Sequence, residues 1–148
     1  MIVKICGIKD KETLICCEKN NVNFFGMIFY KKSPRNLDIK KAIELQNISK
    51  SLKINGVGVF VNEYLENLKI IQNKLDLKYI QLHGNEDNDY LKKLKEYKVK
   101  IIKKISISNQ SDLNNILNFK DADYFLFDYK PKKMNYLVET QKNLIGKL

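Results

Sequence analysis

The stretch Val57-Gly58-Val59-Phe60-Val61, which is followed by Asn62, is apolar over the length of a whole strand. Runs of this kind are typical of strands that are buried on both faces, whereas a strand with one wet face alternates apolar and polar residues. A sheet that is covered on both faces needs crossover helices between parallel strands. The stretch therefore predicts a parallel sheet enclosed by helices.

The rest of the chain repeats this pattern. Apolar runs bounded by turn residues alternate with stretches whose apolar residues recur at helical spacing. The predicted strands lie near residues 2–6, 24–29, 56–61, 78–82, 99–105 and 124–128. The predicted helices lie near residues 11–20, 38–49, 63–74, 87–97 and 110–119, with a further helix or helix fragment over 137–148. Strict βα alternation predicts an α/β protein with a parallel sheet.

Polar side chains stand at the carboxyl ends of the predicted strands. Cys6 closes the first apolar run, and Arg35, Asn62, His83 and Asp128 follow later ones. A row of functional side chains at this edge is how a βα barrel builds an active site. An open doubly wound sheet is the competing architecture, but no Gly-x-Gly-x-x-Gly follows the first strand, so its main dinucleotide-binding signal is absent. The polar residues favour the barrel.

Residues of equal parity share one face of a strand, and three predicted strands have one mixed and one apolar face. A mixed face is expected to line the barrel interior, and the apolar face to contact helices. The mixed faces hold Lys4 with Cys6, Gln81 with His83, and Tyr124 with Asp128.

Composition limits the remaining possibilities. The 148 residues are 44% hydrophobic and contain no linker-like segment, so we expect a single domain over 1–148. No apolar run approaches the roughly 18 residues that span a bilayer, and we expect a soluble, cytoplasmic protein without a membrane partner. Three cysteines without Cys-x-x-Cys or Cys/His spacing indicate neither a disulfide framework nor a zinc site.

The net charge of +10 raises the alternative of a Lys-rich nucleic-acid-binding domain. The lysines are, however, scattered along every predicted helix, and Arg35 is the only arginine. Recognition of bases and phosphates favours arginine, because its planar guanidinium presents a fork of donors. We therefore expect no nucleic-acid partner.

Five motifs together resemble the phosphoribosylanthranilate isomerase family of tryptophan biosynthesis. They follow one another at the spacing of one βα unit. The motifs are Lys4-Ile5-Cys6-Gly7-Ile8, Gly26-Met27-Ile28-Phe29-Tyr30 with Ser33-Pro34-Arg35, Val57-Gly58-Val59-Phe60-Val61-Asn62, Gln81-Leu82-His83-Gly84-Asn85-Glu86 and Leu126-Phe127-Asp128. The resemblance implies a TIM barrel that catalyses the Amadori rearrangement of N-(5-phosphoribosyl)anthranilate to 1-(2-carboxyphenylamino)-1-deoxyribulose 5-phosphate. The implied partner is this small phosphorylated sugar-anthranilate, and no metal or organic cofactor is expected.

The resemblance also implies roles for individual residues. Cys6 would be the general base and Asp128 the general acid. Arg35 would pair with the anthranilate carboxylate, a group that its fork of donors suits. Lys4 would assist electrostatically from the same strand face, and His83 would line the site. Structural roles remain the alternative: a cysteine that ends a buried strand is often a core residue, Asp128 could cap a turn or helix, and His83 could hold loops together.

The pattern departs from the family after Asp128. The family would continue with a glycine-rich phosphate loop and strands seven and eight, but no glycine follows until Gly146. We therefore expect an incomplete TIM (βα)8 barrel of about six βα units, with strands 7 and 8 missing. The lysines at 130, 132 and 133 would offer a cruder phosphate grip. Open edges on the first and sixth strands would invite self-association or a complementing fragment, and an inactive or partner-dependent fragment is the alternative function.

Overall fold

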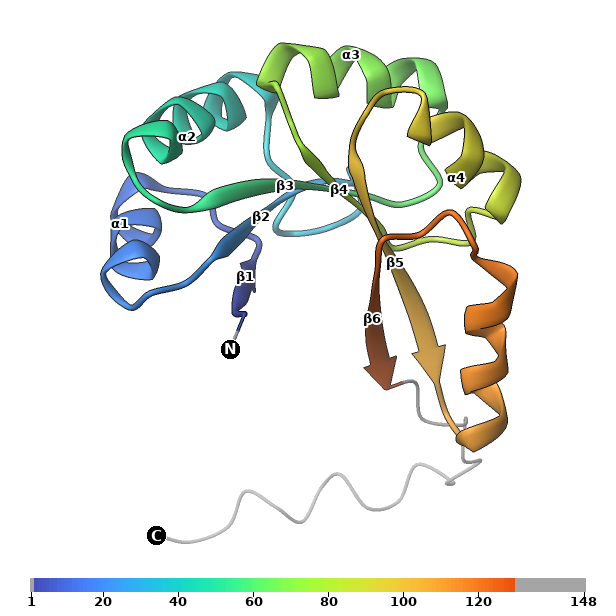
Figure 1. Cartoon of the computed structure of the whole chain (residues 1–148). Helices are drawn as coiled ribbons and strands as arrows, with labels where there is room; N and C mark the ends of the chain where they lie inside the picture. The colour runs from blue at the N-terminus through green and yellow to red at the C-terminus, as the bar shows by residue number, and fades with distance from the viewer. Residues whose placement is uncertain (1, 130–148) are drawn as a thin grey trace, which may run out of the picture.

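The computed structural model describes residues 2–129, which form one curled sheet with its helices on the outer side (Figure 1). The strands are β1 (Lys4–Cys6), β2 (Phe24–Phe29), β3 (Asn55–Phe60), β4 (Tyr79–Leu82), β5 (Lys100–Ile107) and β6 (Tyr124–Tyr129). The helices are α1 (Lys11–Lys19), α2 (Ile39–Ser51), α3 (Leu65–Leu75), α4 (Asn88–Lys95) and the 3₁₀ helix η1 (Gln110–Asn118).

The strands lie in chain order, β1 to β6, and each pair of neighbours is parallel. Each crossover passes through a helix on the convex face of the sheet (Figure 1). The fold is thus a curled half-barrel of six strands, which confirms the predicted α/β class and incomplete barrel. Within residues 2–129, β1 and β6 each have one strand neighbour. The predicted helix over 137–148 and the lysines at 130, 132 and 133 lie outside the described residues.

Helices α1, α2 and α4 begin at aspartates that cap them. The side chains of Asp10, Asp38 and Asp87 accept hydrogen bonds from backbone N–H groups three residues further on. Each cap satisfies an N–H that has no partner within its own helix.

The last crossover differs from a regular α-helix. Residues Gln110–Asn118 form a 3₁₀ helix with no buried residue, begun by a capping box between Asn109 and Asp112. Its segment is rich in Ser, Asp and Asn, whose side chains compete with the backbone for hydrogen bonds. Apolar spacing alone therefore predicted the element but not its type.

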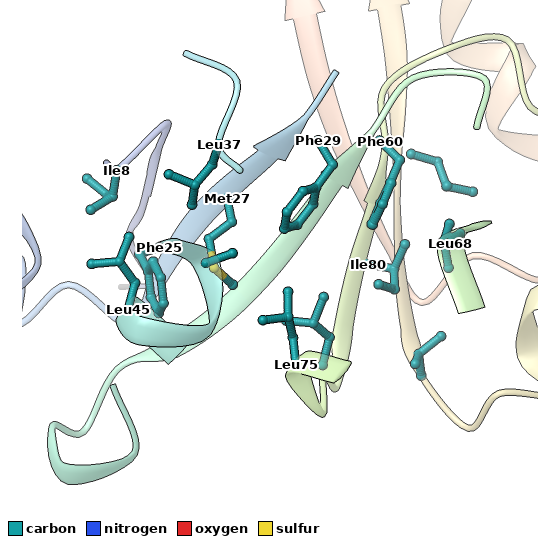
Figure 2. Packing of buried hydrophobic residues seen from close by; sticks show 14 of the residues in the cluster. Ile8, Phe25, Met27, Phe29, Leu37, Leu45, Phe60, Leu68, Leu75 and Ile80 are labelled. Carbon is teal, nitrogen blue, oxygen red and sulfur yellow. The ribbon is translucent and has the colours of Figure 1, made fainter. Parts of the chain in front are cut away.

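The core lies between the sheet and the helices (Figure 2). Phe25, Phe60 and Ile80 come from the strands, and Leu45 and Leu75 come from α2 and α3; each is at most 2% exposed. Burial of a side chain of this size is worth about 1.5–3 kcal/mol. Because these residues fix one face of each strand, residues of the other parity face the concave side. No helix within residues 2–129 is both long and apolar enough to cross a membrane.

Candidate active site

A cavity of about 500 Å³ lies on the concave side of the sheet and collects most of the predicted site residues. Lys4, Cys6, Arg35 and His83 all line it, and Leu126 of β6 adds an apolar wall. Asp128 lies next to His83: the Asp128 Oδ2 is 3.8 Å from the His83 Nε2. The structure therefore brings together the five residues for which the resemblance implies a role, whereas Asn62 does not line this cavity.

The strand register explains how Cys6 and Asp128 reach the same height. Residues paired from strand to strand across the sheet connect Cys6 on β1 with Lys100 on β5. Asp128 on β6 pairs instead with Ser106, which lies six residues beyond Lys100 on β5. An eight-stranded βα barrel has a shear of eight, which is about one residue per strand. Five strand steps separate β1 from β6, so an offset of this size places the two side chains near one level.

Lys4 and Cys6 share the concave face of β1, where Gly26 of β2 leaves room for both. A Cβ at Gly26 would come within 2.7 Å of the Cys6 sulfur and 2.9 Å of the Lys4 ammonium. Burial lowers the pKa of Lys4, and the hydrogen-bonded Cys6 opposes that shift. The amine and the thiol therefore form a contact pair in the cavity wall.

Arg35 reaches the cavity from the loop after β2 and lies against Gly7. Its Nη1 donates a hydrogen bond to the Cys6 carbonyl at 3.1 Å. Gly7 has a φ of 87°, and a Cβ there would meet the Arg35 Cδ at 2.7 Å. Only glycine satisfies both the backbone and the close approach. The loop is fixed to β2 because the Leu37 N–H donates to the Ile28 carbonyl.

His83 follows β4 and has partners on both of its ring nitrogens. Nδ1 lies 3.1 Å from the amide nitrogen of Gln81, and Nε2 faces Asp128. Burial lowers the pKa of His83, Lys104 lowers it further, and Asp128 opposes the shift. The net shift therefore favours the neutral ring. Within residues 2–129, the side chain of Asp128 is 51% exposed.

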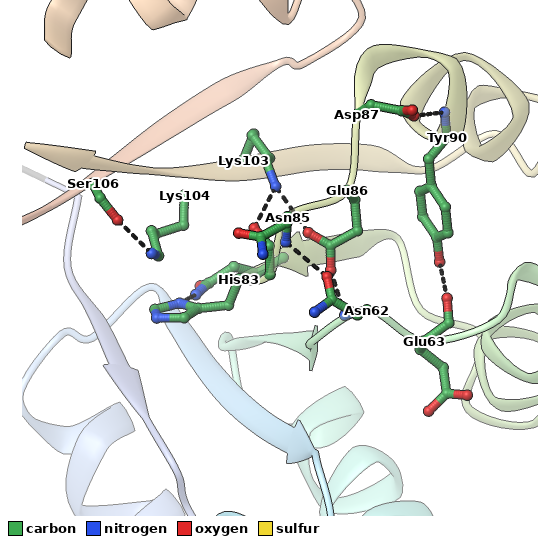
Figure 3. A network of polar contacts seen from close by, with 12 residues as sticks. Asn62, Glu63, His83, Asn85, Glu86, Asp87, Tyr90, Lys103, Lys104 and Ser106 are labelled. Atoms are coloured by element: carbon green, nitrogen blue, oxygen red, sulfur yellow. Dashed lines mark hydrogen bonds and ion pairs between the residues drawn. The ribbon is translucent and has the colours of Figure 1, made fainter.

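Lys104 is a site residue that the sequence analysis missed. Because Leu82 pairs with Lys103, the next residue on β5 comes opposite His83. Its Nζ donates to Ser106 Oγ at 2.7 Å (Figure 3). Parity along β5 could have placed Lys104 on the concave face, but the run of residues 100–107 alternates too weakly to show which parity faces inward.

A buried ion pair ties the loops after β3 and β4 to the middle of β5 (Figure 3). Lys103 Nζ lies 2.8 Å from Glu86 Oε2, and both side chains are 2% exposed. The same ammonium donates to the Gly84 carbonyl, and the other Glu86 oxygen accepts the Asn62 N–H. The Asn62 side chain in turn accepts the Asn85 N–H. Asn62 thus holds the loop that follows His83.

The remaining cysteines lie away from the cavity. Both lie on α1, where Cys17 is buried and Cys16 is exposed. Neither lines the cavity that holds Cys6. Within residues 2–129, no group of three or more His, Cys, Asp or Glu side chains could hold a metal ion.

Fold and site define a class: a βα-barrel protein with a thiol, a carboxylate and anion-binding groups at the carboxyl ends of its strands. The sequence model of the N-(5'-phosphoribosyl)anthranilate (PRA) isomerase family matches residues 3–140. The chain belongs to this family.

Several relatives and solved structures carry the same name. N-(5'-phosphoribosyl)anthranilate isomerase of Staphylococcus haemolyticus is 39% identical over 131 residues, and that of Clostridium acetobutylicum 36% over 126; these alignments cover 86% and 85% of the chain. The chain spans only 62% and 59% of these relatives' length. Phosphoribosyl anthranilate isomerase from Thermotoga maritima superposes with a TM-score of 0.79 at 32% identity, covering 90% of this chain and 64% of that one.

A further solved phosphoribosyl anthranilate isomerase was crystallised in complex with reduced 1-(o-carboxyphenylamino)-1-deoxyribulose 5-phosphate. It superposes with a TM-score of 0.78 at 32% identity and covers 88% of this chain and 66% of that one.

Proposed function

We propose that the chain carries the isomerase half-site for the Amadori rearrangement of N-(5-phosphoribosyl)anthranilate to 1-(2-carboxyphenylamino)-1-deoxyribulose 5-phosphate. Family membership supports the reaction, and the similar structure in complex with the reduced product supports the substrate class. The observation that carries the proposal is the gathering of Lys4, Cys6, Arg35 and His83 around one cavity, with Asp128 beside His83. The cell compartment proposed for this biosynthetic step is the cytoplasm.

In the proposed mechanism, acid and base act in sequence on the sugar. The Asp128 carboxyl protonates the furanose ring oxygen, and the C1–O bond breaks to give an open-chain Schiff base. The Cys6 thiolate then removes the proton from C2, and the electron pair moves to form an enolamine. Tautomerisation of the enolamine yields the ketone. General acid and base groups of this kind contribute about 10²–10⁴-fold each.

The neighbouring groups suit these two roles. The neutral His83 can donate its Nε2 proton toward the Asp128 carboxylate that remains after proton transfer. The Lys4 amine lies beside the Cys6 sulfur and can hydrogen-bond to it. Arg35, held over Gly7, can present its fork to the anthranilate carboxylate.

The experiment measures conversion of N-(5-phosphoribosyl)anthranilate by the 148-residue chain, with product separated by chromatography. We expect Cys6→Ser and Asp128→Asn to lower kcat by about 100-fold or more, because each removes one proton-transfer group. Cys16→Ser is the matched control and should leave turnover unchanged. Absence of turnover, both alone and with a fragment that supplies two further βα units, would refute the proposal.

A specific observation also supports a second candidate, a partner-dependent or inactive barrel fragment. Among residues 2–129, β1 and β6 each pair on one side only, and β6 exposes Phe127 and Tyr129 by 54% and 74%. If the chain alone shows no turnover and a complementing fragment restores it, the chain is a partner-dependent enzyme. If the fragment binds but turnover stays absent, the chain is a non-catalytic remnant.

A further inference from the structure

Gln81 is the deepest polar residue of the cavity and has no role in the mechanism above. It lies on the concave face of β4, two residues before His83, and is 2% exposed. Its side chain lines the same cavity as Cys6 and Arg35. A buried carboxamide has two donors and one acceptor to satisfy.

The orientation of this carboxamide follows from the partners of His83. With Nε2 of Gln81 donating to His83 Nδ1, the ring proton lies on Nε2 and faces the Asp128 oxygen. The reversed carboxamide would need a proton on Nδ1, which would leave a bare Nε2 and no donor for the Asp128 carboxylate that remains after proton transfer. Burial and Lys104 both lower the pKa of His83, so a doubly protonated ring does not rescue that arrangement.

This orientation leaves Oε1 of Gln81 without a hydrogen-bond partner among residues 2–129. Buried acceptors are nearly always paired, because burying them unpaired is costly. The cavity of about 500 Å³ has room for a ligand beside this oxygen. The natural complement of the Gln81 Oε1 acceptor is a neutral hydrogen-bond donor.

We propose that Gln81 binds the substrate: Oε1 accepts a hydrogen bond from a ribose hydroxyl while Nε2 holds His83 in its neutral tautomer. The identity of the donor rests on the proposed function, because that substrate offers two kinds of donor, sugar hydroxyls and the aromatic amine. The amine is ortho to the carboxylate that Arg35 takes, and Arg35 reaches the cavity from the β1–β2 side. Gln81 lies two strands further on, so the hydroxyl is the donor within its reach.

The experiment measures binding of ribose 5-phosphate and of anthranilate to the full 148-residue chain by NMR titration. In Gln81→Met we expect about a threefold to tenfold loss of affinity for ribose 5-phosphate, the worth of one hydrogen bond, and unchanged affinity for anthranilate. Gln46→Met is the matched control, because Gln46 is also buried with an unpartnered Oε1 but lies on α2 next to Gly56, outside this cavity. It should change neither affinity.

Three results would overturn the proposal: no binding of ribose 5-phosphate to the wild type, equal affinity in Gln81→Met, or a loss confined to anthranilate, which would make the amine the partner. The ¹⁵N signals of the ligand-free protein give an independent readout, since the proposal requires the Nε2–H tautomer of His83. An Nδ1–H tautomer would reverse the carboxamide and also overturn it. Gln81-dependent binding without turnover of N-(5-phosphoribosyl)anthranilate, both alone and with the complementing fragment, would refute the proposed function and leave this inference standing.

Discussion

His83 is the only histidine of the chain, so its titration can be followed without ambiguity. Lys104 and Lys4 lower its pKa, whereas Asp128 and Glu86 raise it, and burial is the largest cause of the net decrease. We predict that Lys104→Gln raises the pKa of His83 above its value in the wild type and that Asp128→Asn lowers it below that value. The measurement is an NMR titration of the imidazole signals. Lys100→Gln is the control, because Lys100 bonds to Asp123 instead.

The same titration has a consequence for stability. The pKa of His83 is lower in the folded chain than its ordinary value of about 6.5, so the unfolded chain binds the proton more readily. The stabilising contribution of the neutral ring is therefore complete above about pH 6.5 and declines as the pH falls below it. Lys104→Gln should make this decline shallower. An equally steep decline in that variant would contradict the assigned role of Lys104.

Gly26 provides a test of the Lys4–Cys6 pair. In Gly26→Ala the new methyl group displaces the sulfur from the Lys4 amine, because it would lie 2.7 Å from the one and 2.9 Å from the other. We predict alkylation of Cys6 by iodoacetamide that is slower by about threefold or more, since the thiolate is the reactive form. Peptide mass spectrometry separates Cys6 from the exposed Cys16.

Gly58→Ala is the matched control for this substitution. Its Cβ would meet Leu77 and Phe60 in the core, so it should lower stability while leaving the reactivity of Cys6 in the folded protein unchanged. Equal alkylation rates in Gly26→Ala and the wild type would show that Lys4 does not influence the thiol.

Sequence patterns reached some residues of the site and missed others for a physical reason. Parity along β1 and β4 placed Lys4, Cys6 and His83 on one face, because a strand repeats every two residues. Lys103 has no such signal. Its burial depends on Glu86, 17 residues away in the chain, and a charged residue in a strand ordinarily indicates a wet face.

At the scale of elements, the Lys103–Glu86 pair joins the loops after β3 and β4 to the middle of β5. We predict that Lys103→Met lowers the free energy of unfolding by about 3–5 kcal/mol, because it leaves the Glu86 carboxylate buried without its counter-ion. The double variant Lys103→Met with Glu86→Gln should lose less, since no uncompensated charge remains. Urea denaturation measures both.

The control for this prediction is Lys95→Met. Lys95 pairs with Asp123, but its side chain is 35% exposed and the carboxylate keeps its bond to Lys100. A loss of at most about 1 kcal/mol is expected there. If Lys103→Met cost no more than Lys95→Met, the buried pair would not be what holds these loops.

The order of helices and strands was predictable because each element shows its apolar period within its own short segment: two residues for a strand and 3.6 for a helix. The type of the last crossover was not. The segment 110–118 has apolar residues at helical spacing, yet it covers no core within the described residues, and Leu117 is 72% exposed. Helical stability in proteins comes mostly from packing of an apolar face, which the spacing of residues cannot supply.

At the scale of the whole molecule, the curl of the sheet creates the site and leaves its two edges apart. The sheet curls with its helices on the convex side (Figure 1). The convex face buries the apolar core against these helices, and the concave face carries the polar side chains of the cavity. The order of strands and the polar rim could be predicted from sequence. The height match of Cys6 and Asp128 could not, because the stagger between strands belongs to the sheet as a whole.

The edge of β6 leads to the last prediction, that the 148-residue chain self-associates. The Lys100 N–H donates to Lys78, so even-numbered residues of β5 bond to β4 and odd-numbered ones bond to β6. With Ile102 paired to Tyr124, the N–H groups at 124, 126 and 128 face β5, and those at 125, 127 and 129 point to the side where residues 2–129 offer no strand. Unpaired edges of this kind pair with other chains. In Phe127→Pro the outward N–H is removed and the ladder to β5 is kept.

Sedimentation velocity over a range of concentrations measures the effect. We expect the average mass of the wild type to rise with concentration and that of Phe127→Pro to rise about threefold less. The control is Ile70→Lys at an exposed position on α3, and this variant should associate like the wild type. Tyr64→Pro cannot serve as the control, because the Tyr64 N–H is bonded to Glu63. A monomeric wild type at every concentration, with one sharp melting transition, would show that the edge of β6 is already covered within the chain.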